Sequence, residues 1–175
     1  MTGKTATVDA SDLAGVFDLY ARDLLRYCTQ RVGVSLAEDV VAETFLIAHE
    51  RRHRFDPERG ELLPWLYGIA TNVLRKHIRA ERRALRTLAT RDESDDHDQR
   101  SAERLDAAVT VRRVAAALAA LPRRQRDVLL LFAVAELEYA EIAAALDMPL
   151  GSVQSALHRA RTKVRTAILA SGATR

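Results

Sequence analysis

The chain is poor in residues that interrupt helices and has almost no cysteine. Its 175 residues include 7 glycines, 4 prolines and one cysteine, Cys28. Few chain breakers combined with 30 alanines favour helices over short strands joined by tight turns. A single cysteine excludes an internal disulfide and is typical of a reducing compartment. The sequence therefore predicts an all-α protein.

Long apolar segments are also missing. No unbroken apolar run is longer than that at residues 128–135, which is far shorter than the roughly 18 residues that a membrane-spanning helix needs. The N-terminal stretch MTGKTATVDASD has no apolar core of the kind found in secretory signals. We therefore expect a cytoplasmic protein that does not insert into a membrane.

Charge is distributed unevenly along the chain. Residues 1–86 carry a net charge of +2, residues 87–111 carry −4, and residues 112–175 carry +5. The acidic stretch DESDDHD has no base and no apolar residue, so it cannot bury enough surface to offset the entropy cost of ordering. We predict two small helical domains, residues 1–86 and 103–175, joined by a flexible acidic linker at residues 87–102.

Capping residues and apolar spacing predict the individual helices. Ser11 is a candidate cap for a helix that ends near Arg31. Ser35 and Glu38 form a candidate capping box for a second helix that ends near His53, and Pro64 suits the first position of a third. In the second domain we expect helices at about 103–120, 122–134, 139–146 and 150–169.

Residues 139–157 have the spacing of a helix-turn-helix. The turn needs a left-handed residue at Asp147, a conformation that Asp tolerates. Val153, Leu157, Ala160, Val164 and Ile168 form a buried stripe on the second helix. The outward face instead carries short polar side chains followed by cations, which suits insertion into a DNA major groove; an ordinary solvated basic face is the alternative.

The third predicted helix carries a second cationic stripe. Arg75, Arg79, Arg82 and Arg86 share one face of this helix, and Trp65 lies upstream on it. Cations near an aromatic ring suit single-stranded nucleic acid, whose unstacked bases can pile on the ring. The alternative is that Trp65 belongs to the core and the arginines form a solvated face.

Two segments carry a family resemblance. AEDVVAETFLIAHERRHRFDPERGELLPWLYGIATNVLRKHIRAERR, followed later by LPRRQRDVLLLF and EYAEIAAALDMPLGSVQSALHRARTKVR, resembles the two halves of a bacterial sigma factor of the extracytoplasmic-function group. The resemblance implies a non-enzymatic factor without a cofactor or metal. It implies binding to core RNA polymerase and promoter DNA, with an anti-sigma protein as a candidate further partner.

The resemblance also implies roles for particular residues. The first domain would bind polymerase through Asp39, Glu43, Thr44 and Ile47, and would melt the minus-ten element with Asp56, Arg59, Trp65, Asn72, Arg75 and Arg79. The second domain would read the minus-thirty-five element in duplex DNA with Ser152, Gln154, Ser155, His158, Arg159, Arg161 and Thr162.

Some positions depart from the family pattern. The family often has tryptophan at His49, an acid at Lys76, and Arg or Lys at Phe132, Gln154 and Ala156. Three fewer cations on the upstream-element side should weaken phosphate contacts and reduce the salt dependence of binding. We therefore predict weakened or altered minus-thirty-five recognition.

Three other interpretations are open to test. His49-Glu50-Arg51-Arg52-His53 matches the H-E-x-x-H zinc-protease pattern, but a third ligand is missing and neighbouring arginines would repel a dication. A stand-alone helix-turn-helix regulator would leave the first domain without a role. A sigma-like chain that acts as an antagonist by binding a partner is the third.

Overall fold

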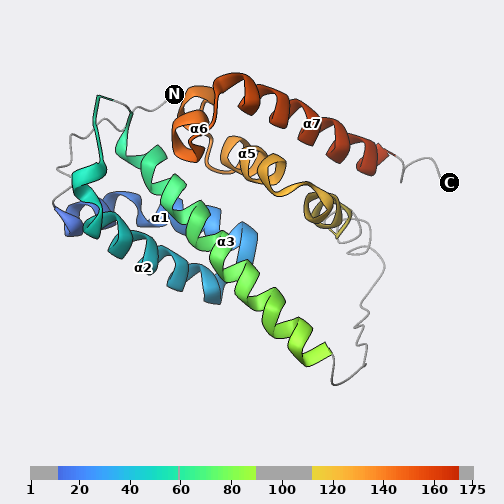
Figure 1. Cartoon of the computed structure of the whole chain (residues 1–175), viewed down its shortest axis with the longest axis horizontal. Coiled ribbons are helices and arrows are strands. Elements are labelled where there is room, and N and C mark those ends of the chain that lie inside the picture. The colour runs from blue at the N-terminus through green and yellow to red at the C-terminus, as the bar shows by residue number, and fades with distance from the viewer. Residues whose placement is uncertain (1–11, 59, 90–111, 170–175) are drawn as a thin grey trace.

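The structure, a computed structural model, describes residues 12–58, 60–89 and 112–169. In these ranges every regular element is helical, as Figure 1 shows: α1 (Leu13–Val32), α2 (Val34–Glu50), the 3-10 helix η1 (Arg52–Arg54), α3 (Leu62–Ala89), α5 (Arg123–Ala133), α6 (Tyr139–Leu146) and α7 (Leu150–Leu169). Residues 112–120 are helical as well. The predicted all-α class is confirmed. From residue 90 on, the predicted linker lies outside the described residues, as does the start of the helix expected at 103–120.

Two predicted helix starts in the first domain are wrong. α2 begins at Val34, because Gly33 turns the chain with a φ of 79° and no side chain caps the new helix. Ser35 is therefore already helical, and the capping box expected with Glu38 does not form. α3 begins two residues before Pro64. Proline is tolerated there because amides in a first turn have no helical acceptor.

The ends of the first two helices also differ from expectation. Asp12 caps α1, with its Oδ1 accepting a hydrogen bond from the Gly15 amide at 3.1 Å. The predicted cap, Ser11, lies outside the described residues. α2 ends at Glu50 rather than near His53, and η1 follows it.

Helices α1, α2 and α3, which we call the first lobe, enclose an apolar core. Leu24, Val40, Leu66 and Leu74 are fully buried, and burial of each such side chain contributes about 1.5–3 kcal/mol. Tyr27 is buried among them, and its hydroxyl lies 2.9 Å from the Thr71 hydroxyl. These contacts fix the face of α3 that points away from the core.

Residues 112–169, the second lobe, contain two helices joined by a tight turn. Asp147 ends α6 in the left-handed conformation (φ 50°, ψ 56°), as predicted. Val153, Leu157 and Ala160 of α7 are buried, also as predicted. The stripe stops there: Ile168 is 40% exposed and, with other residues of α5 and α7, lines an open groove of about 480 Å³.

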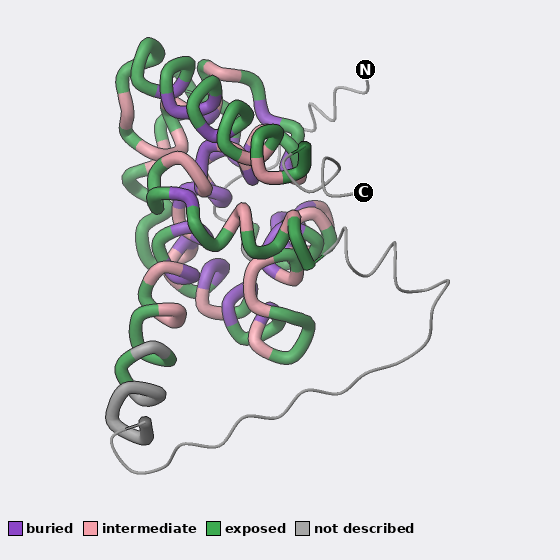
Figure 2. The backbone as a smooth tube through the Cα atoms, turned by 90° about the vertical axis from the view of Figure 1, so that its right-hand side faces the viewer, coloured by how far each residue is buried: buried purple, intermediate pink, exposed green. Residues whose placement is uncertain are grey.

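The two lobes pack against each other and share one continuous buried cluster, which the charge pattern did not predict. In Figure 1, α2 lies on one side of α3, α5, α6 and α7 lie on the other, and α1 passes behind α3. Buried stretches run through both groups of helices in Figure 2. A close approach occurs at Gly68 of α3, where an added Cβ would lie 2.3 Å from the Ala145 carbonyl oxygen of α6. Only glycine fits this crossing without a shift of the backbone.

Candidate nucleic-acid interface

The outward face of α7 presents every residue expected to read the upstream element. All of the side chains in this set are exposed: Ser152, Gln154, Ser155, His158, Arg159, Arg161 and Thr162. The Ser155 hydroxyl donates to the Gly151 carbonyl, and Arg159 Nε donates to the Ser155 carbonyl at 3.2 Å. The Arg161 guanidinium stacks on the Phe132 ring, 4.4 Å from its centroid. Within the described part of the chain none of these arginines pairs with an acid, so their charge is available to a phosphate.

Ala156 differs from its neighbours on α7. Its side chain is only 6% exposed and belongs to the buried cluster. The family's usual cation at this position therefore has no room here. Gln154, the other departure on α7, is exposed, and a longer cationic side chain can be accommodated there.

A second polar face follows α3. Asn72 and Arg79 are exposed, Arg75 is partly buried between them, and the Asn72 Oδ1 accepts from Arg75 Nη1 at 3.0 Å. Arg79 Nε donates to the Arg75 carbonyl at 3.1 Å. The spacing of four residues places Arg75 and Arg79 together, as predicted, and Asn72 lies three residues before Arg75. The side chains of Arg82 and Arg86, the rest of the predicted stripe, are outside what the structure describes.

The loop before α3 lies next to an aromatic pair. Trp65 is half-buried and its ring centroid lies 5.4 Å from that of Phe55. Asp56 is exposed and its Oδ1 accepts from the Glu58 amide at 3.0 Å, a local turn that shapes the loop. Arg59 lies outside the described residues.

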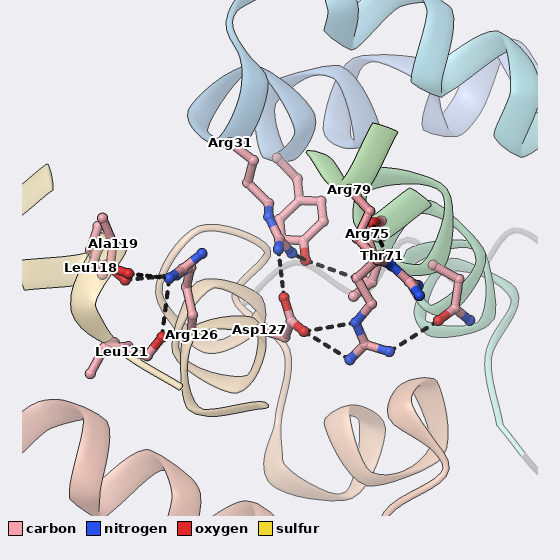
Figure 3. A network of polar contacts seen from close by, with 11 residues as sticks. Arg31, Thr71, Arg75, Arg79, Leu118, Ala119, Leu121, Arg126 and Asp127 are labelled. Carbon is pink, nitrogen blue, oxygen red and sulfur yellow. Dashed lines mark hydrogen bonds and ion pairs between the residues drawn. The ribbon is translucent and has the colours of Figure 1, made fainter. Parts of the chain in front are cut away.

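Arg75 is also held by the second lobe. Its Nε and Nη2 donate to Asp127 Oδ2 at 2.9 and 2.8 Å. Arg31 Nη2 approaches the other oxygen of the same carboxylate at 2.6 Å. Figure 3 shows this network, with Asp127 between the two arginines. In the described structure, a predicted DNA-contact residue is thus already paired with an internal anion.

The four residues expected to bind polymerase, on α2, lie in different environments. Asp39 is exposed and Ile47 is half-buried. Glu43 pairs with Lys76 at 2.9 Å and His77 at 2.7 Å, and hydrogen bonds from these two residues lower the pKa of the Glu43 carboxyl. Thr44 is fully buried, and its hydroxyl donates to the Val40 carbonyl at 2.6 Å, so it supports the helix from within.

Comparisons with known proteins match both lobes to one family. The family model for sigma-70 region 2 matches residues 16–84, and the model for sigma-70 region 4 matches residues 112–164. The sigma factor SigD of Mycobacterium tuberculosis is 31% identical, with 94% of this chain and 80% of SigD covered. SigW of Bacillus subtilis is 29% identical, with 90% and 89% covered. The chain is an extracytoplasmic-function sigma factor.

Solved structures agree on the fold of this sigma factor. The sigma factor RpoE of Bartonella quintana, solved in complex with the anti-sigma factor NepR, is 19% identical with a TM-score of 0.66, over 94% of this chain and 99% of RpoE. CnrH, solved in complex with the cytosolic domain of CnrY, is 23% identical with a TM-score of 0.65, over 93% of each chain. The family models and the curated relatives confirm the resemblance to this family, and the sigma factor directs transcription initiation.

Sequence reasoning missed two residues of the sigma factor's polar network, Arg31 and Asp127. Asp127 is one helical turn before Leu131, on the buried face of α5. An acid on the apolar face of a helix was the available signal, because such a group is buried only when it is paired. Nothing in the sequence indicated which cation would meet it.

The zinc-protease pattern does not form a site in this sigma factor. α2 ends at Glu50 and His53 lies in η1, so the two histidines are not on successive turns of one helix. Among the residues that the structure describes, no three metal-binding side chains gather. The described helices also include none that is long and apolar enough to cross a bilayer.

Proposed function

We propose that the exposed face of α7 reads the minus-thirty-five element in duplex DNA. Short polar side chains near the start of α7 suit base edges, and Arg159 and Arg161 further along suit phosphates. The observation that supports this role is the exposure of the whole predicted set on a helix that follows a tight turn at Asp147. In this role the second lobe acts as a helix-turn-helix.

The first lobe would act on the minus-ten element. Asn72, Arg75 and Arg79 offer one polar face, and Trp65 with the loop at residues 56–60 offers a place for an unstacked base. Extruding a base costs a few kcal/mol, which a fitted pocket must offset. Asp39 and Ile47 on α2 remain our candidates for contact with core polymerase, while Glu43 would first have to leave Lys76 and His77.

In this function the chain contributes binding and positioning, and core polymerase carries out the covalent chemistry. An anti-sigma protein is a further candidate partner, because RpoE was solved with one. A stand-alone DNA-binding regulator is disfavoured because it gives no role to the region 2 match over residues 16–84.

The test is run-off transcription with purified core polymerase on a library of genomic fragments, which yields the start sites and the promoter motif together. On a promoter found this way, Arg159→Ala should weaken upstream binding and reduce the slope of log affinity against log salt by about 1. Arg22→Ala, which removes an exposed cation from α1, is the matched control and should change neither. Failure of the wild-type chain to bind polymerase or to produce any specific start site would refute the proposal.

A further inference from the structure

Asp127 is an anion of the second lobe buried between two cations of the first lobe. Its side chain is 0% exposed, that of Arg31 is 3% exposed and that of Arg75 is 21% exposed. Arg31 comes from α1 and Arg75 from α3, so the three residues, which we call the clasp, join three helices (Figure 3). A buried carboxylate is tolerated only when its charge is paired and its oxygens are hydrogen-bonded. Both conditions are met only while the lobes are in contact.

The two arginines are anchored on their own side before they meet Asp127. Arg31 Nη1 donates to the Tyr27 hydroxyl at 2.8 Å, and that hydroxyl lies against Thr71. Arg75 Nη1 donates to Asn72 Oδ1 at 3.0 Å. Because the first lobe holds both guanidinium groups in place, little side-chain entropy is lost when they bind the carboxylate.

A second contact favours the same arrangement of lobes. Gly68 lies against the Ala145 carbonyl, so α3 and α6 approach with backbone nearly touching. Leu66 and Ala70 of α3 are buried in the same cluster as Ile142 of α6. The closed arrangement therefore rests on a charged contact at α5 and an apolar contact at α6, carried by different residues.

Closure occupies a group that the proposed minus-ten face needs. Arg75 Nε and Nη2 both contact Asp127 while the lobes are together. The hydrogen bond from Arg75 Nη1 to Asn72 lies within α3 and does not depend on closure. A nucleic-acid phosphate would have to compete with a desolvated carboxylate whose Oδ2 contacts two nitrogens of Arg75 and whose Oδ1 contacts Arg31. Hydrogen bonds between charged groups are stronger than those between neutral groups.

We propose that the clasp is an autoinhibitory contact, which keeps the isolated sigma factor closed and withholds Arg75 from DNA until the lobes separate. The proposal rests on the DNA role given to α3 above. The closed form reduces apparent affinity for DNA by the fraction of molecules that are open. Whatever separates the lobes then makes the minus-ten face available.

The chain offers a matched control, because a second ion pair also joins the lobes. Arg26 of α1 lies 3.6 Å from Glu136, and these side chains are 52% and 76% exposed. Exposed pairs of this kind contribute little because water and salt screen them. Asp127→Asn and Glu136→Gln each neutralise one interlobe acid, one buried and one exposed.

The experiment measures the distance between the lobes in the full chain. Spin labels are placed on cysteines introduced at two exposed positions, Asp18→Cys in α1 and Ala133→Cys in α5. Native Cys28 is buried, and burial raises the pKa of its thiol to about 12, so it should not take up label. Double electron–electron resonance then gives the distribution of distances between the two labels, and circular dichroism verifies that each variant keeps its helices.

We expect one short distance in the wild type and in Glu136→Gln, and a broad, longer distribution in Asp127→Asn. Arg31→Gln, which breaks the clasp from the first lobe without touching the proposed DNA face, should behave like Asp127→Asn. If one of these two variants loses its helices, the distance measured in the other variant tests the clasp. An unchanged distance in a folded clasp variant, or an equal change in Glu136→Gln, would overturn the clasp.

The second readout is binding of a mixed-sequence single-stranded DNA of about 20 nucleotides, followed by fluorescence anisotropy. Opening should raise the affinity of Asp127→Asn by about fivefold or more over Glu136→Gln, the range of ordinary coupling between sites. Separated lobes with unchanged affinity would overturn the autoinhibitory role. If the clasp variants show the expected longer distances but run-off transcription gives no specific start site, the proposed function fails and the clasp does not. The two failures are therefore distinguishable.

Discussion

Gly68→Ala tests the packing of α3 on α6. The added Cβ would lie 2.3 Å from the Ala145 carbonyl oxygen, about 1 Å inside the ordinary closest approach of carbon and oxygen of roughly 3.3 Å. The obstacle is backbone at the end of α6, which cannot rotate away as a side chain could. Overpacking of this kind costs about 1–3 kcal/mol.

The same substitution should favour the helix in which it lies. Alanine in a helix interior is about 1 kcal/mol more favourable than glycine, whether the lobes are closed or open. The clash applies only to the closed form, so the balance should move toward open by about 5- to 150-fold, since 1.4 kcal/mol is a factor of ten. We expect a larger radius of gyration in small-angle scattering without loss of helix content.

Gly151→Ala is the matched control for this measurement. Gly151 is also helical, in the first turn of α7, and an added Cβ meets nothing within 4 Å. It should leave the radius of gyration unchanged. If Gly68→Ala raises the melting temperature and keeps the compact radius, the close approach of α3 and α6 does not hold the lobes together and the reasoning is refuted.

Three further predictions concern separate parts of the chain. Asp147→Val should lower the free energy of unfolding by about 1–2 kcal/mol, because a branched residue resists the left-handed conformation, whereas Asp147→Gly should not lower it in the same denaturation assay. Gln154→Arg should strengthen binding to duplex DNA and steepen the slope of log affinity against log salt by about 0.9. Ala156→Arg should instead lower the melting temperature, because the Ala156 side chain is buried. No gain in affinity from Gln154→Arg would contradict the predicted weakening of minus-thirty-five recognition. The pKa of the Glu43 carboxyl is lowered from 4.5, so its contribution to the free energy of unfolding is present above pH 4.5 and is lost as the pH falls through the lowered pKa. Glu43→Gln should therefore reduce the fall in the free energy of unfolding at acid pH. An unchanged fall in this variant would contradict the prediction.

Much of the candidate interface could be predicted from local sequence. The exposed set on α7 follows from helical periodicity, and the turn at Asp147 follows from the tolerance of Asp for a left-handed backbone. Both depend on interactions within about four residues, which a single sequence displays. The wrong start of α2 also has a local cause, because turn geometry at Gly33 outweighed the capping signal at Ser35.

Contacts between lobes were outside the reach of such patterns. Arg31 and Asp127 are 96 residues apart in sequence, and Arg75 and Asp127 are 52 apart. Charge composition predicted two lobes but carried no information on whether their faces fit each other. Ala156 illustrates the same limit: from the sequence it counted only as a missing cation, and the tertiary structure buries it.

The sequence by itself determined the helices, the family and the residues that face solvent on α7, because these depend on neighbours along the chain and on recognisable segments. Only the tertiary structure decided that Asp127 binds Arg31 and Arg75, and that Glu43 pairs with Lys76 and His77. The same holds for the close packing of α6 on α3 at Gly68. The reason is physical: an ion pair or a close helix crossing exists only when two distant segments are placed within a few ångströms, and that placement is set by packing of the whole chain.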